Sequence, residues 1–174
     1  MIGRQVPEAV FHTRVRNDAL EGPNPYEWRQ LTSGDVFGGR NVVLFALPGA
    51  FTPACSDSHL PGYEASYDAF RALGVDEVVC LAVNDAFTMF QWARAHEISR
   101  VFMLPDGNGD FTRLMGMLVS RRKTGMGYRS WRYSMHVVDG EIRRFFAEPG
   151  FRDEPDGVPV GVSAAGVMLD ELKR

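Results

Sequence analysis

Cys55 is the residue of this chain most suited to chemistry, because of the elements expected around it. An apolar run, residues 41–47, has the pattern of a buried strand, and Pro48 with Gly49 ends it. The cysteine follows at the expected start of a helix. A helix N-terminus presents unpaired N–H groups and a partial positive charge, which favour anionic sulfur. The sequence therefore predicts a nucleophilic thiolate at a strand-to-helix junction.

A thiolate at this place needs more than the helix. An ordinary cysteine ionises near pH ~8.5, and moving that midpoint to about 6 requires roughly 3.4 kcal/mol. A helix end contributes at best about 2 kcal/mol. One partly buried guanidinium at ~4 Å contributes roughly 4 kcal/mol at an effective dielectric of 20, before its desolvation is counted. The helix alone therefore falls short, and one guanidinium at that distance would cover the remainder.

Thr52 stands three residues before Cys55. In a first helical turn this spacing places the hydroxyl close to the sulfur, where it could donate to the sulfur and accept a substrate proton at once. A threonine at that position can also be an ordinary N-cap with no chemical role. Both interpretations stand on the spacing alone.

The composition suits a globular protein with a core. With 174 residues, 45% hydrophobic content and a net charge of −3, we expect one domain, residues 1–174. Residues 1–15 lack the apolar stretch of a secretory signal, and no apolar run approaches the ~20 residues that span a bilayer. Two cysteines suit a functional thiol in a reducing compartment better than a disulfide scaffold. We expect a cytoplasmic protein without a membrane segment.

Strands and helices are expected to alternate. Strand patterns occupy residues 10–15, 26–31, 40–47, 77–83 and 101–104, and Asp139-Gly140 marks a hairpin between 134–138 and 141–147. Residues 148–159 contain enough Pro, Gly and charge for a long loop. A β-rich start, βαβ units, a hairpin and a last helix indicate an α/β, thioredoxin-like fold with an N-terminal β extension.

Three helices are expected between these strands. Aromatic residues at helical spacing follow the cysteine, and Gly74 stands where that helix would end. Asn84-Asp85 starts a second helix, which carries Phe87, Phe90 and Ala93 on one side. Ser163 can cap the last helix.

The residues around the cysteine also form a long motif. Residues 48–63 read PGAFTPACSDSHLPGY and closely resemble the active-site signature of peroxiredoxins of the type II (Prx5) subfamily, PGAFTPxCSxxHxPGY, at every fixed position. Residues 129–134, RSWRYS, resemble the arginine-bearing strand of that family, and residues 83–85 and 104–109 extend the likeness over most of the chain. The resemblance implies the peroxiredoxin architecture.

The resemblance also implies a function and roles. It implies an antioxidant, thiol-dependent peroxidase that reduces hydrogen peroxide and alkyl hydroperoxides through a sulfenic acid on Cys55, without metal, haem or flavin. By resemblance Arg132 is the cation beside the sulfur, Thr52 is catalytic, and Pro48 belongs to the substrate pocket and shields the oxidised sulfur from water. The planar fork of an arginine can donate to both peroxide oxygens.

Cys80 lies in the apolar run 78–83, where a buried, inert thiol is the usual interpretation. In some type II relatives a cysteine at this spacing has been considered a resolving partner, so Cys80 is a weak candidate. It would have to leave its strand, because a disulfide needs Cα atoms within about 7 Å. Certain Prx5 relatives carry a resolving cysteine before the last helix, but residues 160–163 contain none.

The sulfenic acid should therefore be reduced by an outside thiol. We expect glutathione with glutaredoxin, since some close relatives carry a fused glutaredoxin domain. Thioredoxin is the alternative reductant.

His59 stands four residues after Cys55, a spacing that could indicate a metal pair or a thiolate–imidazolium pair. No second pair accompanies it. We interpret His59 as a histidine that bonds to the backbone and holds its loop in place, and we leave it out of the catalytic set. The other histidines have no partner spacing, so no metal site is predicted.

Residues 111–138 contain six basic residues and no acidic one. A solvated face explains this pattern, and a docking surface for an acidic partner or for glutathione carboxylates is the alternative. Nucleic acid is not expected as a partner, since the whole chain is acidic on balance.

Two other classes of function compete with a peroxidase. A thiol–disulfide oxidoreductase would want Cys-x-x-Cys, but Ser58 occupies the second position. A redox sensor or holdase could use the same sulfenic acid, and the sequence does not separate it from an enzyme. Many Prx5 proteins dimerise beside the active site, so we expect a homodimer, with Phe51, Phe87 and Trp92 either at that contact or in the core.

Overall fold

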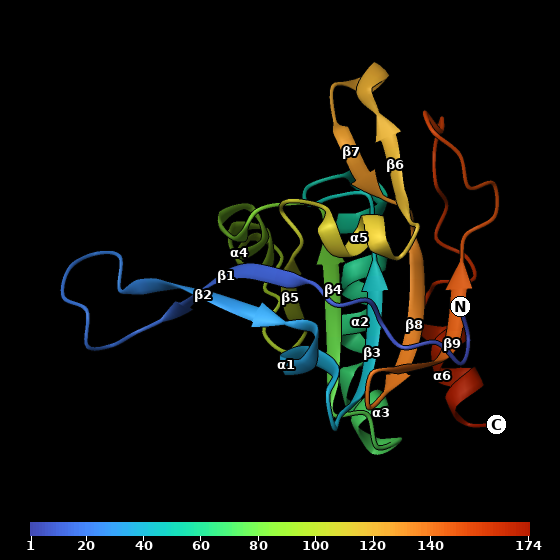
Figure 1. The fold of residues 1–174 in the computed structure, drawn as a ribbon, viewed down its shortest axis with the longest axis horizontal. Helices are drawn as coiled ribbons and strands as arrows, with labels where there is room; N and C mark the ends of the chain where they lie inside the picture. The colour runs from blue at the N-terminus through green and yellow to red at the C-terminus, as the bar shows by residue number, and fades with distance from the viewer.

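A five-stranded mixed sheet forms the centre of the computed structural model, which describes all 174 residues (Figure 1). Its strand order is β5-β4-β3-β8-β9. Three strands are parallel, β3 (Asn41–Ala46), β4 (Glu77–Ala82) and β5 (Phe102–Pro105), and β8 (Tyr133–Val138) and β9 (Glu141–Ala147) form the antiparallel hairpin. This arrangement confirms the thioredoxin-like α/β fold and the hairpin that Asp139-Gly140 predicted.

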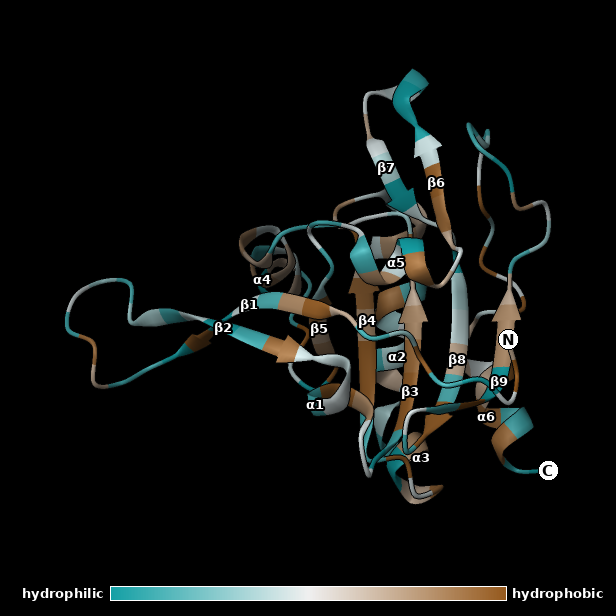
Figure 2. Ribbon diagram, viewed as in Figure 1, coloured by the Kyte–Doolittle hydropathy of each residue, from teal (hydrophilic) through white to brown (hydrophobic).

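Each face of the sheet has its own hydrophobic core, because side chains alternate along a strand. On one face, Val43 and Phe45 pack against η1 (Cys55–His59), α2 (Leu60–Ala65), α3 (Tyr67–Ala72), α4 (Ala86–Ala95) and α6 (Ala165–Leu172). On the other, Val42 and Leu44 pack against β1 (Val10–Arg16), α1 (Ser33–Phe37) and α5 (Asp110–Leu114). Figure 2 shows β3 and β4 hydrophobic along most of their length, as strands covered on both faces should be.

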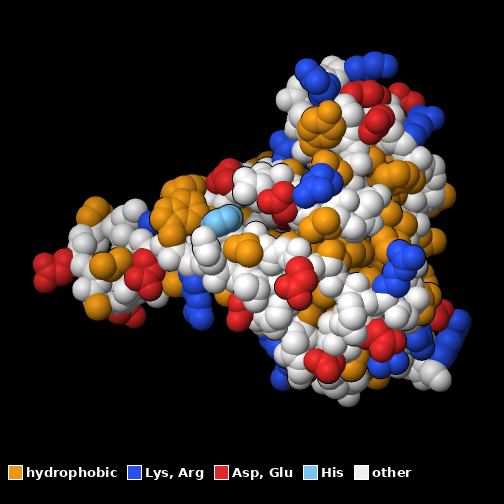
Figure 3. Space-filling view, in the orientation of Figure 1, with side chains coloured by type: hydrophobic (Ala, Val, Ile, Leu, Met, Phe, Trp, Pro, Cys, Tyr) orange, Lys and Arg blue, Asp and Glu red, His pale blue; other side chains and the backbone are white.

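The N-terminal β extension is a two-stranded arm. Strands β1 and β2 (Tyr26–Thr32) pair antiparallel and carry the loop between them away from the body (Figure 1). Hydrophobic side chains gather where the arm leaves the body (Figure 3). Trp28 is 60% exposed and meets Phe87 of α4 edge to face, with 5.5 Å between the ring centroids. The arm is therefore anchored to α4 by aromatic contacts.

Phe87 and Phe90 share one side of α4, as expected, and both contact the arm, but the sequence did not show which side of the helix is buried. Asp85 caps the helix as expected, accepting from the Thr88 N–H at 3.0 Å. The buried side chains, however, are Ala86, Met89 and Trp92, while Phe87 is 52% exposed. Phe87 and Phe90 lie on the outer side of the helix, where they pack against Trp28 and Tyr26 of the arm. Contacts between residues so far apart in the sequence leave no local pattern. Trp92 is fully buried and so belongs to the core, not to a contact with a partner.

Several short elements escaped the sequence analysis. They are α1, α5, the hairpin of β6 (Leu118–Arg121) and β7 (Gly127–Ser130), and the single turn η2 (Arg122–Thr124) between its strands. Elements of three to five residues carry too few positions for a periodic signal. For α1 a signal existed, because Thr32 and Asp35 form a capping box.

The C-terminal region follows the expectation except at its cap. Residues 148–159 contain no helix or strand, and α6 follows. Ser163 does not cap α6, whose N-cap is Ala164, because its hydroxyl donates to the Glu148 carboxylate at 2.6 Å. None of the helices has the length and apolar character that crossing a bilayer requires.

Candidate active site

Cys55 lies in the first turn of a helix, as predicted. Helical backbone begins at Pro53, a residue suited to the first helical position because it has no N–H to leave unpaired. From Cys55 to His59 the helix widens, and the Leu60 N–H reaches back to the Cys55 carbonyl. Such π turns occur mostly at functional sites. The Cys55 side chain is fully buried.

Arg132 comes from the other side of the site. It lies between β7 and β8, is 2% exposed, and each of its guanidinium nitrogens faces one acceptor. Nη2 donates to the Cys55 Sγ at 3.4 Å, Nη1 lies 3.0 Å from the His59 Nδ1, and Nε donates to the Val158 carbonyl at 3.2 Å. The structure thus brings Cys55 and Arg132 together across 77 positions of sequence.

The charge of Arg132 has one anionic partner available. No carboxylate lies within salt-bridge distance of its guanidinium, and two of its three partners, an imidazole and a carbonyl, are neutral. A buried charge is costly unless it is paired. Of the three partners, the Cys55 sulfur is the one that can carry a negative charge.

The loop before the cysteine is held from two directions. The Thr52 hydroxyl donates to the Gly49 carbonyl at 2.7 Å, and the Asn84 side chain accepts from the Ala50 N–H at 2.9 Å. A side chain on Gly49 would lie 3.3 Å from both Asn84 Oδ1 and Arg129 Nη1, so glycine permits this close approach. Thr52 therefore donates its proton to the loop, not to the sulfur as the sequence had suggested, and its oxygen lone pairs can accept a proton from a substrate.

Pro48 is buried directly after β3, whereas Phe51 has a positive φ of 61° and is 55% exposed. A positive φ is uncommon outside glycine and marks local strain. The loop therefore turns one apolar side chain inward beside the site and presents another to solvent.

His59 lies closer to the chemistry than the sequence indicated. Its Nε2 bonds to the Ser163 backbone carbonyl at 3.1 Å, the kind of backbone bond that was expected. Its Nδ1 contact with Arg132, however, was missed, because no local pattern links residues 73 positions apart. Burial first, and then the charge of Arg132, lower the pKa of His59 to about 4, so the ring is neutral at pH 7.

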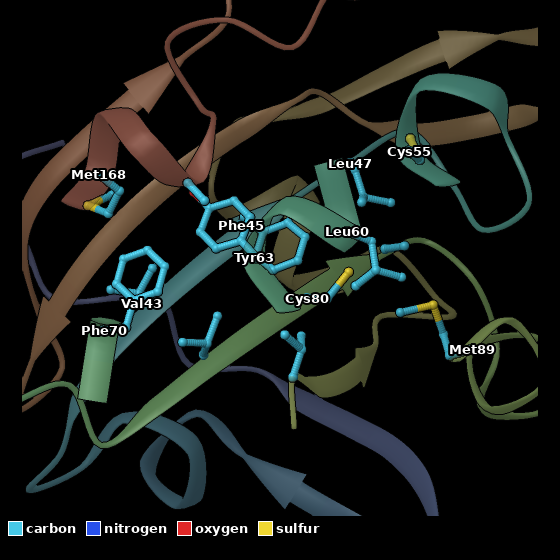
Figure 4. Packing of buried hydrophobic residues seen from close by; sticks show 14 of the residues in the cluster. Val43, Phe45, Leu47, Cys55, Leu60, Tyr63, Phe70, Cys80, Met89 and Met168 are labelled. Atoms are coloured by element: carbon cyan, nitrogen blue, oxygen red, sulfur yellow. The ribbon is translucent and has the colours of Figure 1, made fainter. Parts of the chain in front are cut away.

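Cys80 has none of these partners. It lies within β4, fully buried in the same hydrophobic cluster as Cys55 (Figure 4). Burial first, and then the neighbouring Cys55 sulfur, raise the pKa of Cys80 well above its ordinary value. The two cysteines are not joined by a disulfide.

Part of the basic stretch, residues 121–123, is hydrogen-bonded to the loop 148–159 of the same chain. The Glu154 carboxylate accepts from the backbone N–H groups of Arg122 and Lys123 at 3.0 and 3.1 Å, and the Arg121 side chain donates to the Pro155 carbonyl at 3.1 Å. The loop 148–159 thus packs against the β6–β7 hairpin. The structure brings together no group of three His, Cys, Asp or Glu side chains that could hold a metal ion.

Comparisons with known proteins identify the family of this chain. The sequence profile of the family described as Redoxin matches residues 6–158. The chain is 54% identical over 173 residues to "Peroxiredoxin sll1621" of Synechocystis, covering 99% of this chain and 92% of that protein. It is 42% identical over 172 residues to "Hybrid peroxiredoxin hyPrx5" of Haemophilus influenzae, covering 99% of this chain and 66% of the other.

A solved structure gives the same result in three dimensions. The reduced Prx3 of Vibrio vulnificus in complex with H₂O₂ superimposes with a TM-score of 0.84 at 32% identity, covering 99% of this chain and 98% of that one.

Proposed function

This chain belongs to the Redoxin family and, within it, to the type II (Prx5) peroxiredoxins, which makes it a thiol-dependent peroxidase, and from that premise we propose that Cys55 is its nucleophile and that Arg132 and Thr52 complete the catalytic site. One observation carries the assignment. A fully buried sulfur at the first turn of a helix accepts a hydrogen bond, at 3.4 Å, from a guanidinium that has no carboxylate partner.

The reaction assigned to Cys55 is an attack of thiolate on oxygen. One peroxide oxygen forms a bond with sulfur while the O–O bond breaks, and the electron pair of that bond leaves with the other oxygen as hydroxide or alkoxide. The leaving group takes a proton from water, and Cys55 becomes a sulfenic acid. Arg132 stabilises the thiolate and then the leaving oxygen, because its Nη2 already faces the sulfur. The H₂O₂ in the Vibrio vulnificus Prx3 structure supports hydrogen peroxide as a substrate.

Thr52 and Pro48 act on the substrate side of this site. The Thr52 hydroxyl donates to Gly49, so its oxygen accepts the proton of the incoming hydroperoxide and orients it. Pro48, buried at the end of β3, lines the substrate pocket and shields the oxidised sulfur from bulk water.

A pair of cysteine variants tests the nucleophile. We expect Cys55→Ser to abolish thiol-dependent peroxide consumption, because an alcohol at that position forms no comparable anion. Cys80→Ser is the matched control and should keep its turnover. Peroxide consumption with a thiol reductant is the measurement, and unfolding curves show that both variants are folded. Activity retained in Cys55→Ser would contradict the assignment, and folded wild type that forms a sulfenic acid without turnover would favour a sensor or holdase.

We propose glutathione with glutaredoxin as the reductant of the sulfenic acid. The chain offers no second thiol for the purpose, since residues 160–163 contain no cysteine and Cys80 is enclosed within the sheet. Glutathione would displace water from the sulfenic acid to give a mixed disulfide on Cys55, and a second thiol, from glutaredoxin or glutathione, would then release the Cys55 thiolate. This chemistry fits the reducing cytoplasm, which we propose as the location.

The two reductant systems can be compared on one preparation. Turnover should be faster with glutaredoxin and glutathione than with thioredoxin, and mass spectrometry should find one glutathione on Cys55 after a single peroxide equivalent. Faster turnover with thioredoxin and no glutathione adduct would assign recycling to thioredoxin instead.

We also propose a homodimer whose contact lies beside the active site. Phe51, on the loop before the cysteine, and Phe87, in the first turn of α4, are 55% and 52% exposed, and Trp28 extends the apolar surface around Phe87. Paired burial of such aromatics across a two-fold axis would shield the thiol. Phe87→Glu should yield monomers in light scattering at micromolar concentration. Leu73→Glu is the control, since Leu73 is also exposed but precedes the N-terminal end of β4, whereas Phe51 and Phe87 follow the C-terminal ends of β3 and β4.

A further inference from the structure

His59 takes part in an unbroken set of hydrogen bonds that ends on the reactive sulfur. Its ring lies between Arg132 and the C-terminal segment, 1% exposed. Arg132 Nη1 lies 3.0 Å from its Nδ1, and the Ser163 carbonyl lies 3.1 Å from its Nε2. The same guanidinium donates to the Cys55 Sγ. The proposed catalytic set of Cys55, Thr52 and Arg132 does not use this ring.

The partners of the ring define its tautomer. A guanidinium has only donors, so the Nδ1 that faces Arg132 must be an acceptor without a proton. The proton is then on Nε2, where the Ser163 carbonyl accepts it. Burial and the arginine charge keep the pKa of His59 near 4 and hence keep the ring neutral at pH 7. A protonated ring would turn a donor toward Arg132 and break the contact.

The Ser163 carbonyl is itself held in position. It accepts a second hydrogen bond from the Tyr63 hydroxyl at 2.8 Å. Oε1 of Glu148 accepts from the Ser163 N–H at 2.9 Å, the Ser163 hydroxyl at 2.6 Å and the Gly161 N–H at 2.7 Å. The Glu148 N–H donates to the Arg132 carbonyl at 3.0 Å. One carboxylate therefore ties the segment before α6 to the residue that carries the guanidinium.

We propose that His59, in its Nε2–H tautomer, is a positioning residue that holds the Arg132 guanidinium in the orientation that points Nη2 at Cys55, and that Ser163 sets this tautomer. The inference rests on the proposed role of Cys55. An arginine held only at Nε can still rotate about its Cγ–Cδ and Cδ–Nε bonds. The added hydrogen bond at Nη1 fixes the plane of the guanidinium. Without the bond to His59, the positive charge of Arg132 stays near Cys55, but Nη2 no longer points at the sulfur.

Two replacements of His59 separate positioning from packing. In His59→Asn the side-chain oxygen can lie near the former Nδ1 and still accept from Arg132. In His59→Gln the amide can lie near the former Nε2 and still donate to Ser163, but no acceptor faces Arg132. The readouts are the rate of peroxide reduction and the pH dependence of alkylation at Cys55, read by mass spectrometry on that cysteine. Melting temperatures monitor stability.

We expect His59→Gln to reduce peroxide at least 10-fold more slowly than the wild type and to be alkylated at Cys55 only at higher pH. His59→Asn should stay within about 3-fold of the wild type with a nearly unchanged alkylation profile. Equal losses in both variants that follow the melting temperature would assign a packing role to His59 and overturn the proposal. Wild-type behaviour of His59→Gln would overturn it as well.

A measurement on the wild type keeps the proposal testable if a variant does not fold. The ¹⁵N shifts of the His59 ring at pH 7 should identify a neutral imidazole with its proton on Nε2. A proton on Nδ1 would overturn the proposal. Either result leaves the role of Cys55 to its own test, since loss of activity in Cys55→Ser does not depend on the tautomer.

Discussion

The two cysteines of this chain are the same residue in equally buried positions, and the structure gives them opposite properties. Both are fully buried and belong to one hydrophobic cluster. Cys55 lies in the first turn of a helix and accepts from Arg132, whereas Cys80 lies in the middle of β4, where the backbone is committed to two neighbouring strands. Burial there raises the pKa of Cys80.

The difference teaches that burial does not by itself make a thiol inert. Desolvation disfavours the charged form of any thiol, so a buried thiolate needs a compensating charge that is also withdrawn from water. Arg132, 2% exposed, donates a hydrogen bond directly to the Cys55 sulfur. At Cys80 burial raises the pKa, and the charge of Arg132 opposes that effect without overcoming it. Removing the charge of Arg132 should make the reactivity of Cys55 more like that of Cys80.

The largest expected effect comes from Arg132→Met. Loss of roughly 4 kcal/mol of charge interaction at most corresponds to a peroxide rate constant about 100 to 1000 times lower. Alkylation of Cys55 should move to higher pH at the same time, as measured by iodoacetamide labelling across a pH series. Arg113→Met is the control, because its side chain is 61% exposed and bonded only to the surface residue Asp110. An unchanged labelling profile in Arg132→Met would contradict the electrostatic account.

A second effect concerns stability in acid. His59 binds a proton near pH 6.5 in the unfolded chain and only near pH 4 in the folded one. Between these values the unfolded state binds more protons, so stability present above pH 6.5 is lost as the pH falls toward 4. The expected loss from His59 is about 3 kcal/mol in the free energy of unfolding.

Urea unfolding at pH 7, 6, 5 and 4 of the wild type and of His59→Gln measures this contribution. The variant starts lower at pH 7 but should lose less stability on acidification. Glu148 weakens both proteins on acidification, because its pKa is lowered: burial tends to raise that pKa, but the hydrogen bonds from Ser163 and Gly161 outweigh burial. The difference between the two stability curves therefore reports on His59 together with its charge interaction with Glu148. Parallel curves for the two proteins would contradict the low pKa of His59.

The smallest effect is expected at Cys80. Cys80→Ser places a hydroxyl in an apolar strand and should lower the free energy of unfolding by about 1–3 kcal/mol. Cys80→Ala removes only the sulfur and should cost about 1 kcal/mol. In both variants the peroxide rate should stay at the wild-type value. A loss of turnover at unchanged stability would indicate that Cys80 is a resolving thiol. Cys80 would then take part in the reaction, as Cys55 does.

Sequence reasoning found the parts of the site that depend on residues close together in the chain. The strand before Pro48, the helix start at Cys55 and the Asp85 cap of α4 depend on side chains within a few positions of one another. Arg132 was found by its motif, because spacing alone does not identify which of six basic residues reaches the sulfur. The buried face of α4 was not found, because the arm, more than 50 positions earlier in the chain, decides which aromatic side chains are covered.

By itself, the sequence determined the order of the main strands and helices, the candidate nucleophile Cys55 and the absence of any cysteine other than Cys55 and Cys80, since these follow from residue types and short-range periodicity. Only the tertiary structure decided which groups face Cys55. The contacts between His59 and Arg132, and between His59 and Ser163, join residues 73 and 104 positions apart. Such contacts exist because the chain packs its helices and its C-terminal segment on one sheet, and no local propensity encodes them.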